Sequence, residues 1–379
     1  MSFWKQQPVD VVDKISQIMD TKELLAKVDS QIESLRFKLE YKVFYGEKMD
    51  TASRHNILTF INDNYIRSET MSLVYTHELL RYYLVNSLVI HFHPKGKPDI
   101  IAGVIIGKNT DLYVDGNIYN TVEVDFLSLN SSLRSMGIAP YMIGVLTRES
   151  IIHYNERNIC AAYYTIGKEI PTPTYGKKEI FHRPVNIGNL VRGGFLSEPV
   201  QPYVSIFNSF EQLLSVKYSC GAPNPELAKD LEERLYEYSK KTYMIFDKKT
   251  HADISRMLEN KAFHNFEFRD GSGNLTDFIN LYNIDIYNDT TNMGFKDGRI
   301  YVIYLSNNEP EHVCRVMDTI AAYCHRENIT DILSICDILH IGDHYGQVKF
   351  MAGGSYLNYY MFNMNMIPVE NHKNGLSTI

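Results

Sequence analysis

Apolar side chains recur at helical spacing in several stretches of the chain. Ile57 and Leu58 lie four and three positions before Ile61, which places all three on one face of a helix. Pro140 stands where another helix would start, at a position that does not need its missing N–H. The pattern predicts helices over residues 54–65, from 76 onward, and over 140–153, 225–240, 251–260 and 311–327.

Other stretches alternate between apolar and polar side chains, with the period of two that is typical of strands. Val122 and Val124 fall on one face of such a stretch and Glu123 on the other. Residues 88–92 and 100–106 flank a turn rich in proline, lysine and glycine, and we expect them to form a hairpin. We predict strands over residues 88–92, 100–106, 122–129, 159–165, 263–269, 275–284, 300–305 and 332–335.

Helices and strands alternate in a similar order in the two halves of the chain. Glycines, prolines and serines gather between residues 190 and 225 and indicate a boundary there, whereas residues 21–40 are mixed and polar. We therefore expect a multi-domain α/β or α+β fold with a domain boundary between residues 190 and 225.

Composition narrows the class of protein. Of the 379 residues, 44% are hydrophobic and 22% are charged, as in globular proteins. The chain lacks the run of about 18 apolar residues that a membrane span needs, and its start lacks a secretory signal. Five cysteines without a C-x-x-C pair argue against disulfides and zinc, so we expect a cytoplasmic location. The net charge of -7 argues against nucleic acid as a partner.

The segment from the strand at 122–129 to Pro140 has the features of a phosphate-binding turn. Arg134 can contact phosphate, Gly137 allows close approach of the backbone, and N–H groups point outward where the next helix begins. The pattern R-x-x-G-x-A is similar to the pyrophosphate turn of the GNAT acyl-CoA N-acyltransferases. An arginine that caps an ordinary loop is the structural alternative.

Further blocks follow in a fixed order along the whole chain. They are F-W-K-Q-Q-P-V at 3–9, E-V-D-F-L-S-L at 123–129 continuing through Arg134 to A-P at 139–140, Y-T-I-G at 164–167 with prolines at 171 and 173, F-H-R-P-V-N at 181–186, T-D-F at 276–278, L-N-Y-Y-M-F-N at 357–363 and G-L at 375–376. In this order the blocks resemble those of the N-myristoyltransferases, which transfer myristate from CoA to the N-terminal glycine of proteins.

The resemblance implies an α+β fold of two fused GNAT-like halves with mixed twisted sheets flanked by helices. The N-terminal half, 1–200, would bind acyl-CoA, and the C-terminal half, 201–379, would form the peptide groove and supply the catalytic C-terminus. Myristoyl-CoA would be a co-substrate, with no metal and no permanently bound cofactor, and the partner would be a glycine-initiated peptide. The residues implied to bind acyl-CoA are Ser2, Phe3, Trp4, Phe126, Leu127, Ser128, Leu129, Arg134, Ser135, Gly137, Ile138 and Ala139. Those implied to bind the peptide are Thr165, Gly167, His182, Tyr301 and Leu357.

The resemblance also implies how transfer occurs. The backbone N–H groups of Phe126 and Leu127 would form an oxyanion hole at an irregularity in their strand, and Thr165 would help to position the substrate amine. The carboxylate of the last residue, Ile379, would act as the base. A frayed C-terminal tail is the alternative at that end of the chain.

This chain departs from the family at charged positions. Met136 and Gly137 replace a lysine and an arginine of the CoA loop, so phosphate binding would rely on backbone amides and Arg134. Acidic positions on the peptide side are reduced at 66–70 and lost at 353–355, which predicts a weaker preference for basic residues in the peptide.

Other interpretations stay open. His91 and His93 alternate like a metal pair, but without a third ligand nearby we expect an exposed strand face.

We expect a monomeric N-myristoyltransferase-like enzyme. The alternatives are a non-catalytic acyl-CoA or acyl-peptide binding protein and a GNAT-type acetyltransferase with a short acyl pocket.

Overall fold

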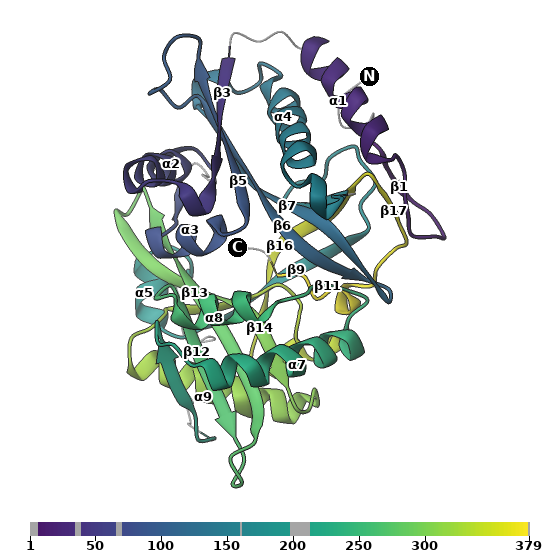
Figure 1. Cartoon of the computed structure of the whole chain (residues 1–379). Coiled ribbons are helices and arrows are strands. Elements are labelled where there is room, and N and C mark those ends of the chain that lie inside the picture. The colour runs from purple at the N-terminus through teal and green to yellow at the C-terminus, as the bar shows by residue number, and fades with distance from the viewer. Residues whose placement is uncertain (1–6, 35–38, 66–69, 160, 198–212, 378–379) are drawn as a thin grey trace. The chain divides into compact units, whose positions relative to one another are not determined.

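The computed structural model describes residues 7–34, 39–65, 70–159, 161–197 and 213–377 (Figure 1). Contacts divide the chain into two compact units. Unit 1 comprises Met1–Ile66, Leu80–Lys177 and Asn358–Val369, and unit 2 comprises Arg67–Leu79, Lys178–Leu357 and Glu370–Ile379. Each unit thus includes a piece from near the C-terminal end, and the functional halves 1–200 and 201–379 stay a prediction.

Unit 1 is built on a sheet with the strand order β16-β8-β7-β6-β5-β3. Its strands are β3 (Leu39–Tyr45), β5 (Ser87–Pro94), β6 (Gly103–Val114), β7 (Asn117–Leu129), β8 (Ala161–Ile166) and the end of β16 (Met351–Phe362). Neighbours run antiparallel except β7 and β8, which are parallel. The expected hairpin is therefore confirmed as β5 and β6, and the sheet is mixed.

Helices α1 (Thr21–Ser34), α2 (Thr51–Asn64) and α4 (Ile138–His153) belong to unit 1, and α3 (His77–Leu84) crosses its limit. Buried side chains of α4, including Met142 and Val145, pack against Ile90 and Phe92 of β5, and α1 packs on α4. Burial of apolar area of this kind contributes about 25 cal/mol per Å². The packed face fixes α4, and with it the loop that precedes α4.

A small sheet ties the two ends of the chain together within unit 1. Strand β17 (Met364–Met366) lies between β1 (Val9–Val11) and β2 (Ser16–Gln17). Beside it Asn363, which is fully buried, accepts a hydrogen bond from the N–H of Met19 and donates one to its carbonyl, both at 2.9 Å. This asparagine of the L-N-Y-Y-M-F-N block therefore has a structural role.

Within unit 2 the strands are hydrogen-bonded in the order β10-β12-β13-β14-β15-β9, with both parallel and antiparallel neighbours. The strands are β9 (Gly176–Pro184), β10 (Lys217–Cys220), β12 (Phe263–Arg269), β13 (Leu275–Asn288), β14 (Met293–Leu305) and β15 (Ile332–Ile335), and β4 (Met71–Val74) pairs with the end of β13. Strands β14 and β15 are parallel. The remaining elements are α5 (Ile187–Arg192), α7 (Pro225–Thr242), β11 (Ile245–Asp247), α8 (His251–Glu259) and α9 (Pro310–Arg326).

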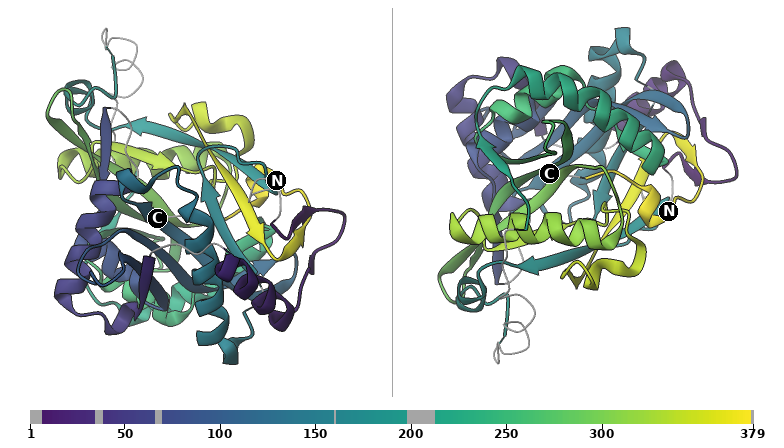
Figure 2. Two further views of the ribbon diagram at one scale, coloured as in Figure 1. Left: turned by 90° about the horizontal axis from the view of Figure 1, so that it is seen from above. Right: turned by 90° about the horizontal axis from the view of Figure 1, so that it is seen from below.

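The helices of unit 2 begin at residues suited to that position. Asn224 accepts a hydrogen bond from the N–H of Leu227 at the start of α7, and Thr250 and Asp253 form a reciprocal capping pair in α8. Figure 2 shows the long helices α7 and α9 from below. Tyr323 of α9 contacts the ring of Tyr218 in β10 at 5.0 Å, so α9 packs on that end of the sheet.

A buried ionic cluster links β9 to α9 and explains the arginine of the F-H-R-P-V-N block. The guanidinium of Arg183 is fully buried and pairs with Asp318, whose carboxylate also accepts hydrogen bonds from Lys349 at 2.9 Å. Buried charges are tolerated only when they are paired in this way. Arg183 therefore stabilises the fold beside the predicted peptide residue His182.

The strongly periodic elements agree with the sequence. The α+β class is confirmed, and each predicted helix and strand has a counterpart, although β6 continues to Val114 beyond the predicted end at 106 and β14 begins at Met293 before the predicted start at 300. The elements that were not predicted are α1, α5, β1, β2, β3, β4, β9, β10, β11, β16 and β17. Pro140 is the third residue of α4 and not the first. The exposed face expected for His91 and His93 is wrong, because both side chains are buried in β5.

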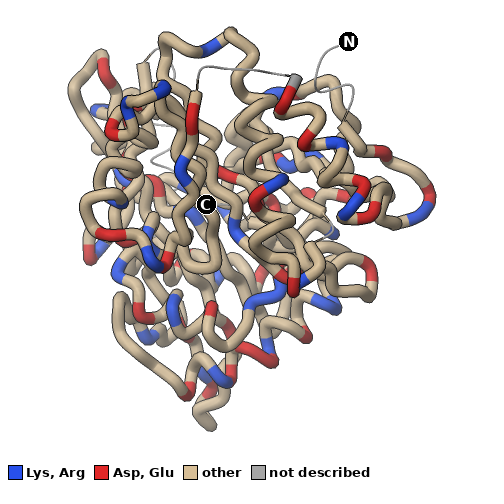
Figure 3. The backbone as a smooth tube through the Cα atoms, turned by 45° about the horizontal axis from the view of Figure 1, so that its top comes forward, with Lys and Arg blue, Asp and Glu red and all other residues tan. Residues whose placement is uncertain are grey.

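The described residues contain neither a membrane-spanning helix nor a group of metal ligands. None of the described helices has the length and apolar character needed to cross a membrane. Among the same residues, histidine, cysteine and carboxylate side chains nowhere gather in a group of three or more that could hold a metal ion. Basic and acidic positions are interspersed along the described chain (Figure 3).

Candidate active site

The first feature of the site is a bulge in β7. Val104 of β6 lies opposite Ser128 and Ile106 lies opposite Asp125, so Phe126 and Leu127 together face one residue of β6. Phe126 has φ +52°, a left-handed conformation that is strained for a bulky residue. This is the irregularity that the resemblance implied, and it interrupts the regular pairing of β6 and β7 at the two predicted donors.

The second feature is the separation of β7 from β8. The two parallel strands pair from Thr121–Ala161 to Glu123–Tyr163, although β7 continues to Leu129 and β8 to Ile166. Beyond Glu123 this edge of β7 does not pair with β8. Because buried backbone groups need hydrogen-bond partners, such an edge is suited to accept a ligand next to the bulge.

Asp125 occupies one of the two predicted oxyanion donors. Its Oδ1 accepts a hydrogen bond from the N–H of Phe126 at 2.8 Å and another from the hydroxyl of Tyr65 at 2.6 Å. The ring of Phe126 is buried between Tyr65 and Tyr83, with centroid distances of 5.2 and 5.1 Å. The hydrogen bond from Phe126 to Asp125 was not predicted from the sequence. Its only signal there is a carboxylate directly before the two predicted donors.

The predicted CoA loop follows β7 directly. Arg134 donates from Nη2 to the carbonyl of Asn64 at 2.6 Å and from Nε to the carbonyl of Leu129 at 3.4 Å, which holds the exposed loop. Gly137 has φ +74° and precedes the first residue of α4, Ile138. The first N–H groups of a helix have no partner within it and carry partial positive charge. The loop therefore offers backbone donors and one guanidinium, and no lysine.

His182 belongs to a buried polar chain in unit 2. Its Nδ1 lies 2.8 Å from the hydroxyl of Ser334, which in turn donates to Asp297. Burial lowers the pKa of His182, opposed by Asp297. The ring also contacts Phe195 at a centroid distance of 5.3 Å. The sequence analysis did not predict Ser334 or Asp297, because their link to His182 depends on the pairing of β15 with β9.

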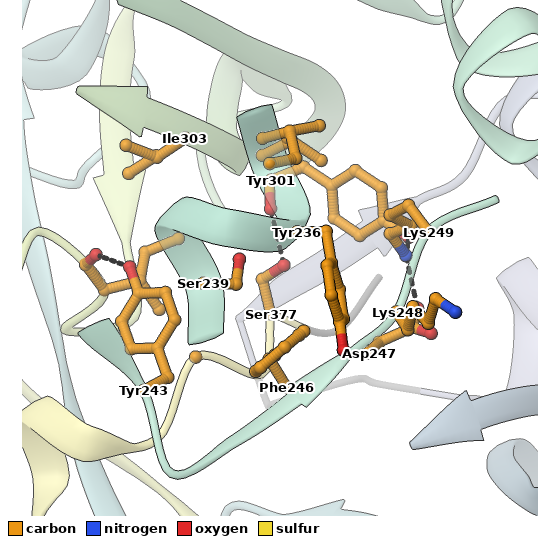
Figure 4. Close-up of a pocket in the computed structure, with 14 residues that line it drawn as sticks. Tyr236, Ser239, Tyr243, Phe246, Asp247, Lys248, Lys249, Tyr301, Ile303 and Ser377 are labelled. Carbon is orange, nitrogen blue, oxygen red and sulfur yellow. Dashed lines mark hydrogen bonds and ion pairs between the residues drawn. The ribbon is translucent and has the colours of Figure 1, made fainter. Parts of the chain in front are cut away.

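Tyr301 lies in a pocket of unit 2 with about 590 Å³ of space, part of it open to solvent (Figure 4). Its hydroxyl accepts a hydrogen bond from Lys249 at 2.8 Å, and Lys249 pairs with Asp247. Lys248 lies over the ring of Tyr236 at 5.2 Å. The pocket thus joins aromatic walls to two ammonium groups. Its lining comprises Leu235, Tyr236, Ser239, Tyr243, Phe246, Asp247, Lys248, Lys249, Tyr301, Val302, Ile303, Ile338, Gly375 and Ser377.

The C-terminal segment is packed as far as it is described. Asn374 and Leu376 are buried, and the N–H of Gly375 donates to the carbonyl of Ile245 at 2.8 Å. Ser377 donates to the carbonyl of Tyr301 at 2.6 Å. Residues up to 377 are therefore not a frayed tail. Ile379, the predicted base, lies outside the described residues, as do Ser2, Phe3 and Trp4 of the predicted acyl-CoA set.

Comparisons with known proteins agree with this geometry. Residues 18–175 match the family described as myristoyl-CoA:protein N-myristoyltransferase, N-terminal domain. The chain is 24% identical to the glycylpeptide N-tetradecanoyltransferase of Plasmodium falciparum, covering 99% of this chain and 92% of the relative. The enzyme of the same name from Candida albicans is 22% identical, with 97% and 85% covered. The crystal structure of Saccharomyces cerevisiae N-myristoyltransferase with bound myristoyl-CoA shares the fold, with a TM-score of 0.82, 17% identity, and 100% and 99% covered.

Residues 18–175 thus match the N-myristoyltransferase family, and the chain is similar to glycylpeptide N-tetradecanoyltransferases over nearly its whole length. The part that matches the N-myristoyltransferase N-terminal domain contains the bulge at Phe126, the loop at Arg134, and Thr165 and Gly167 at the end of β8. His182, Tyr301 and Leu357 lie beyond the matched residues, on β9, β14 and β16 of unit 2. The described residues that were predicted to bind acyl-CoA all lie in unit 1, between the bulge and the start of α4.

Proposed function

We propose that this chain transfers myristate from myristoyl-CoA to the N-terminal glycine of peptides. The observation that carries the proposal is the bulge at Phe126 and Leu127, which lies where β7 leaves β8 and directly precedes the loop at Arg134. Acyl transfer from a thioester needs backbone donors and a phosphate-binding turn close together, and this stretch supplies both. The curated relatives named glycylpeptide N-tetradecanoyltransferase support the same reaction.

In the proposed reaction the glycine amine attacks the thioester carbonyl, the C–N bond forms, and the C–S bond breaks as the CoA thiolate leaves. The N–H groups of Phe126 and Leu127 would stabilise the oxyanion, which is typically worth about 3 kcal/mol or on the order of 100-fold in rate. Because Asp125 accepts from the N–H of Phe126 in the structure, its carboxylate must release that donor when substrate binds.

The amine must lose a proton, because an α-amino group has a pKa of about 7.7–8.0 and is largely charged at neutral pH. We assign this step to the carboxylate of Ile379, with Thr165 positioning the amine. A free α-carboxylate has a pKa of about 3.5, and burial would raise it toward a useful value. The packing of residues 374–377 supports a fixed C-terminal end over a frayed one.

The co-substrate would be held largely by backbone groups. We assign the phosphates to Arg134, Ser135 and Gly137 and to the N–H groups of Ile138 and Ala139, and the acyl thioester to residues 126–129. This division follows the inference of two GNAT-like halves, 1–200 for acyl-CoA and 201–379 for the peptide. The reaction needs no further subunit, so we propose a monomer, and we propose a cytoplasmic location.

On the peptide side we propose a weak preference for basic residues downstream of glycine. By the resemblance, Gly353 and Gly354 stand where a carboxylate would meet a basic peptide residue. In the pocket beside Tyr301, Lys249 is paired with Asp247, and Lys248 adds a positive charge. Like charges disfavour a basic peptide there. A panel of glycine-initiated peptides differing in one lysine or glutamate tests this, and a strong preference for lysine would contradict it.

The decisive experiment incubates the chain with myristoyl-CoA and a glycine-initiated peptide, and follows CoA release and product mass. Acylated peptide at a rate that depends on the chain is the expected result. The same assay with acetyl-CoA tests the acetyltransferase alternative, for which acetyl transfer would exceed myristoyl transfer.

A non-catalytic acyl-CoA or acyl-peptide binding protein is the second candidate. The hydrogen bond from Phe126 to Asp125 favours it, because an oxyanion donor held by a carboxylate cannot stabilise a transition state. Tight binding of myristoyl-CoA without turnover would support this reading. Asp125→Asn would then test whether the carboxylate is what prevents transfer.

A further inference from the structure

Lys178 is a fully buried lysine that the proposed reaction does not use. It lies in β9, and its Nζ donates to the carbonyl of Cys336 at 3.1 Å and to the carbonyl of Leu376 at 3.0 Å. The first carbonyl follows β15, and the second lies three residues before the end of the chain. One ammonium therefore joins a strand of unit 2 to the C-terminal segment.

An ammonium in this position is costly to the fold. Removing a charge from water is unfavourable unless it is compensated, and the carbonyls of Cys336 and Leu376 carry only partial negative charge. Burial lowers the pKa of Lys178 to about 8, against the opposing effects of Cys336 and Asp337. An apolar side chain would avoid this cost, so packing alone does not explain a lysine here.

The segment that Lys178 holds is short and is fixed from several sides. Gly375 pairs with β11, Ser377 donates to Tyr301, and Leu376 is 1% exposed between them. The contact with Lys178 differs from these because it is charge-assisted, which makes it stronger than a neutral hydrogen bond.

We propose that Lys178 is a positioning residue that fixes residues 374–377, the segment that leads to the carboxylate assigned above as the base. The inference rests on the proposed function for its catalytic consequence, but the anchoring itself does not. Lys178 is not assigned as a base or nucleophile, because its side chain is fully buried and Nζ is engaged by two carbonyls.

The test compares three full-length variants with the unmodified chain. Lys178→Met removes the donors and the charge at similar volume, whereas Lys178→Gln removes the charge but keeps an N–H donor. Lys177→Met is the matched control, because the neighbouring lysine pairs with Glu169 at an exposed position.

The first readout does not depend on activity. Hydrogen exchange of the amides of residues 374–377, together with release of C-terminal residues by carboxypeptidase, reports the order of the segment. In Lys178→Met we expect both rates to rise about tenfold or more, since local opening governs exchange. We expect Lys178→Gln to be intermediate and Lys177→Met to match the unmodified chain.

The second readout separates positioning from stability. A base displaced by about 1 Å costs on the order of 100-fold in rate, so Lys178→Met should lower kcat about 10- to 100-fold. The KM for myristoyl-CoA should stay within about twofold, because the anchor acts on the amine and not on CoA. The thermal unfolding midpoint should not fall in parallel with kcat, because the substitution also removes the unfavourable buried charge.

The outcomes separate three claims, which are the anchoring of the C-terminal segment, the positioning role of Lys178 and the proposed function. Unchanged exchange and carboxypeptidase rates in Lys178→Met overturn the anchor, whatever the chain catalyses. Faster exchange with unchanged kcat overturns the positioning role. An unmodified chain that transfers no myristate defeats the proposed function instead, and the exchange experiment still tests the anchor.

Discussion

The loop over 130–139 in unit 1 and the segment over 374–377 in unit 2 have opposite constructions, although we assign both to the same reaction. The side chain of Met136 in the loop is 58% exposed, whereas Leu376 in the C-terminal segment is 1% exposed. The loop offers backbone groups to a ligand from solvent. The segment is instead held by contacts with residues far away in sequence, among them Ile245, Tyr301 and Lys178.

Because of this difference, substitutions in the two regions should affect different properties of the chain. Substitutions in the loop should alter the affinity for CoA and leave the stability of the chain nearly unchanged. Substitutions in the C-terminal segment should alter stability and turnover while CoA binding persists. The following predictions test this contrast, beginning with the largest effect.

Deletion of Thr378 and Ile379 should give the largest loss of activity. Removal of a general base typically costs about 10²–10⁴-fold, so kcat should fall by at least two orders of magnitude. The Kd for myristoyl-CoA, measured by calorimetry, should stay within about twofold, since the loop is intact. Turnover that survives the deletion would contradict the role of the terminal carboxylate.

Lys178 should make stability depend on pH. Its pKa is lowered from 10.5 to about 8 in the fold, so the folded chain releases this proton before the unfolded chain does. Stability therefore rises with pH through this range, by about 2.5 kcal/mol between pH 7 and 10. Urea unfolding at several pH values should show this rise as a difference between the chain and Lys178→Met. Parallel curves for the two proteins would contradict it.

Substitution of one glycine in each region compares the stability of the C-terminal segment with that of the loop. A Cβ on Gly375 would lie 2.4 Å from the ring of Tyr243, and Gly375→Ala should cost about 2 kcal/mol through overpacking. A Cβ on Gly137 would meet nothing within 4 Å, so Gly137→Ala should cost only the penalty of φ +74°, about 1 kcal/mol. Urea midpoints measure both changes. A larger loss of stability at Gly137 than at Gly375 would reverse the contrast.

Arg134→Ala should have the smallest effect. Loss of one exposed charge-assisted contact should raise the KM for myristoyl-CoA about tenfold at most, equal to about 1.4 kcal/mol. The effect should shrink at high salt, and the unfolding midpoint should stay constant. Arg326→Ala, at an exposed arginine paired with Glu327, is the control. An unchanged KM would assign phosphate binding to the backbone alone.

The elements that the sequence predicted are those whose pattern is local. The bulge at Phe126 was expected from a family block, and α4 from its apolar spacing. Helix α1 was missed, although Leu24, Val28 and Ile32 recur every four residues, because charged neighbours obscure the pattern. Strand β9 was missed because its buried side chains include Lys178 and Arg183, which resemble surface residues in a sequence.

The candidate site was predictable as a set of positions and not as a set of contacts. The sequence named Phe126 as an oxyanion donor, but the hydrogen bond to Asp125 depends on the left-handed turn of the bulge. It placed His91 and His93 on an exposed face because alternation does not show that both faces of β5 are covered. Long-range contacts such as Lys178 with Leu376 have no local signal at all.

Unit 1 is assembled from segments that are distant in the sequence, which affects when it can fold during synthesis. Strand β8 pairs with residues 358–362 of β16, and Met19 is held by Asn363, so unit 1 needs a piece of chain that is made long after β8. At about 5–20 residues per second, the ribosome adds that piece many seconds after β8 has emerged. Until then the nascent chain carries an open strand edge on β8, which makes chaperone protection during translation most valuable in that interval.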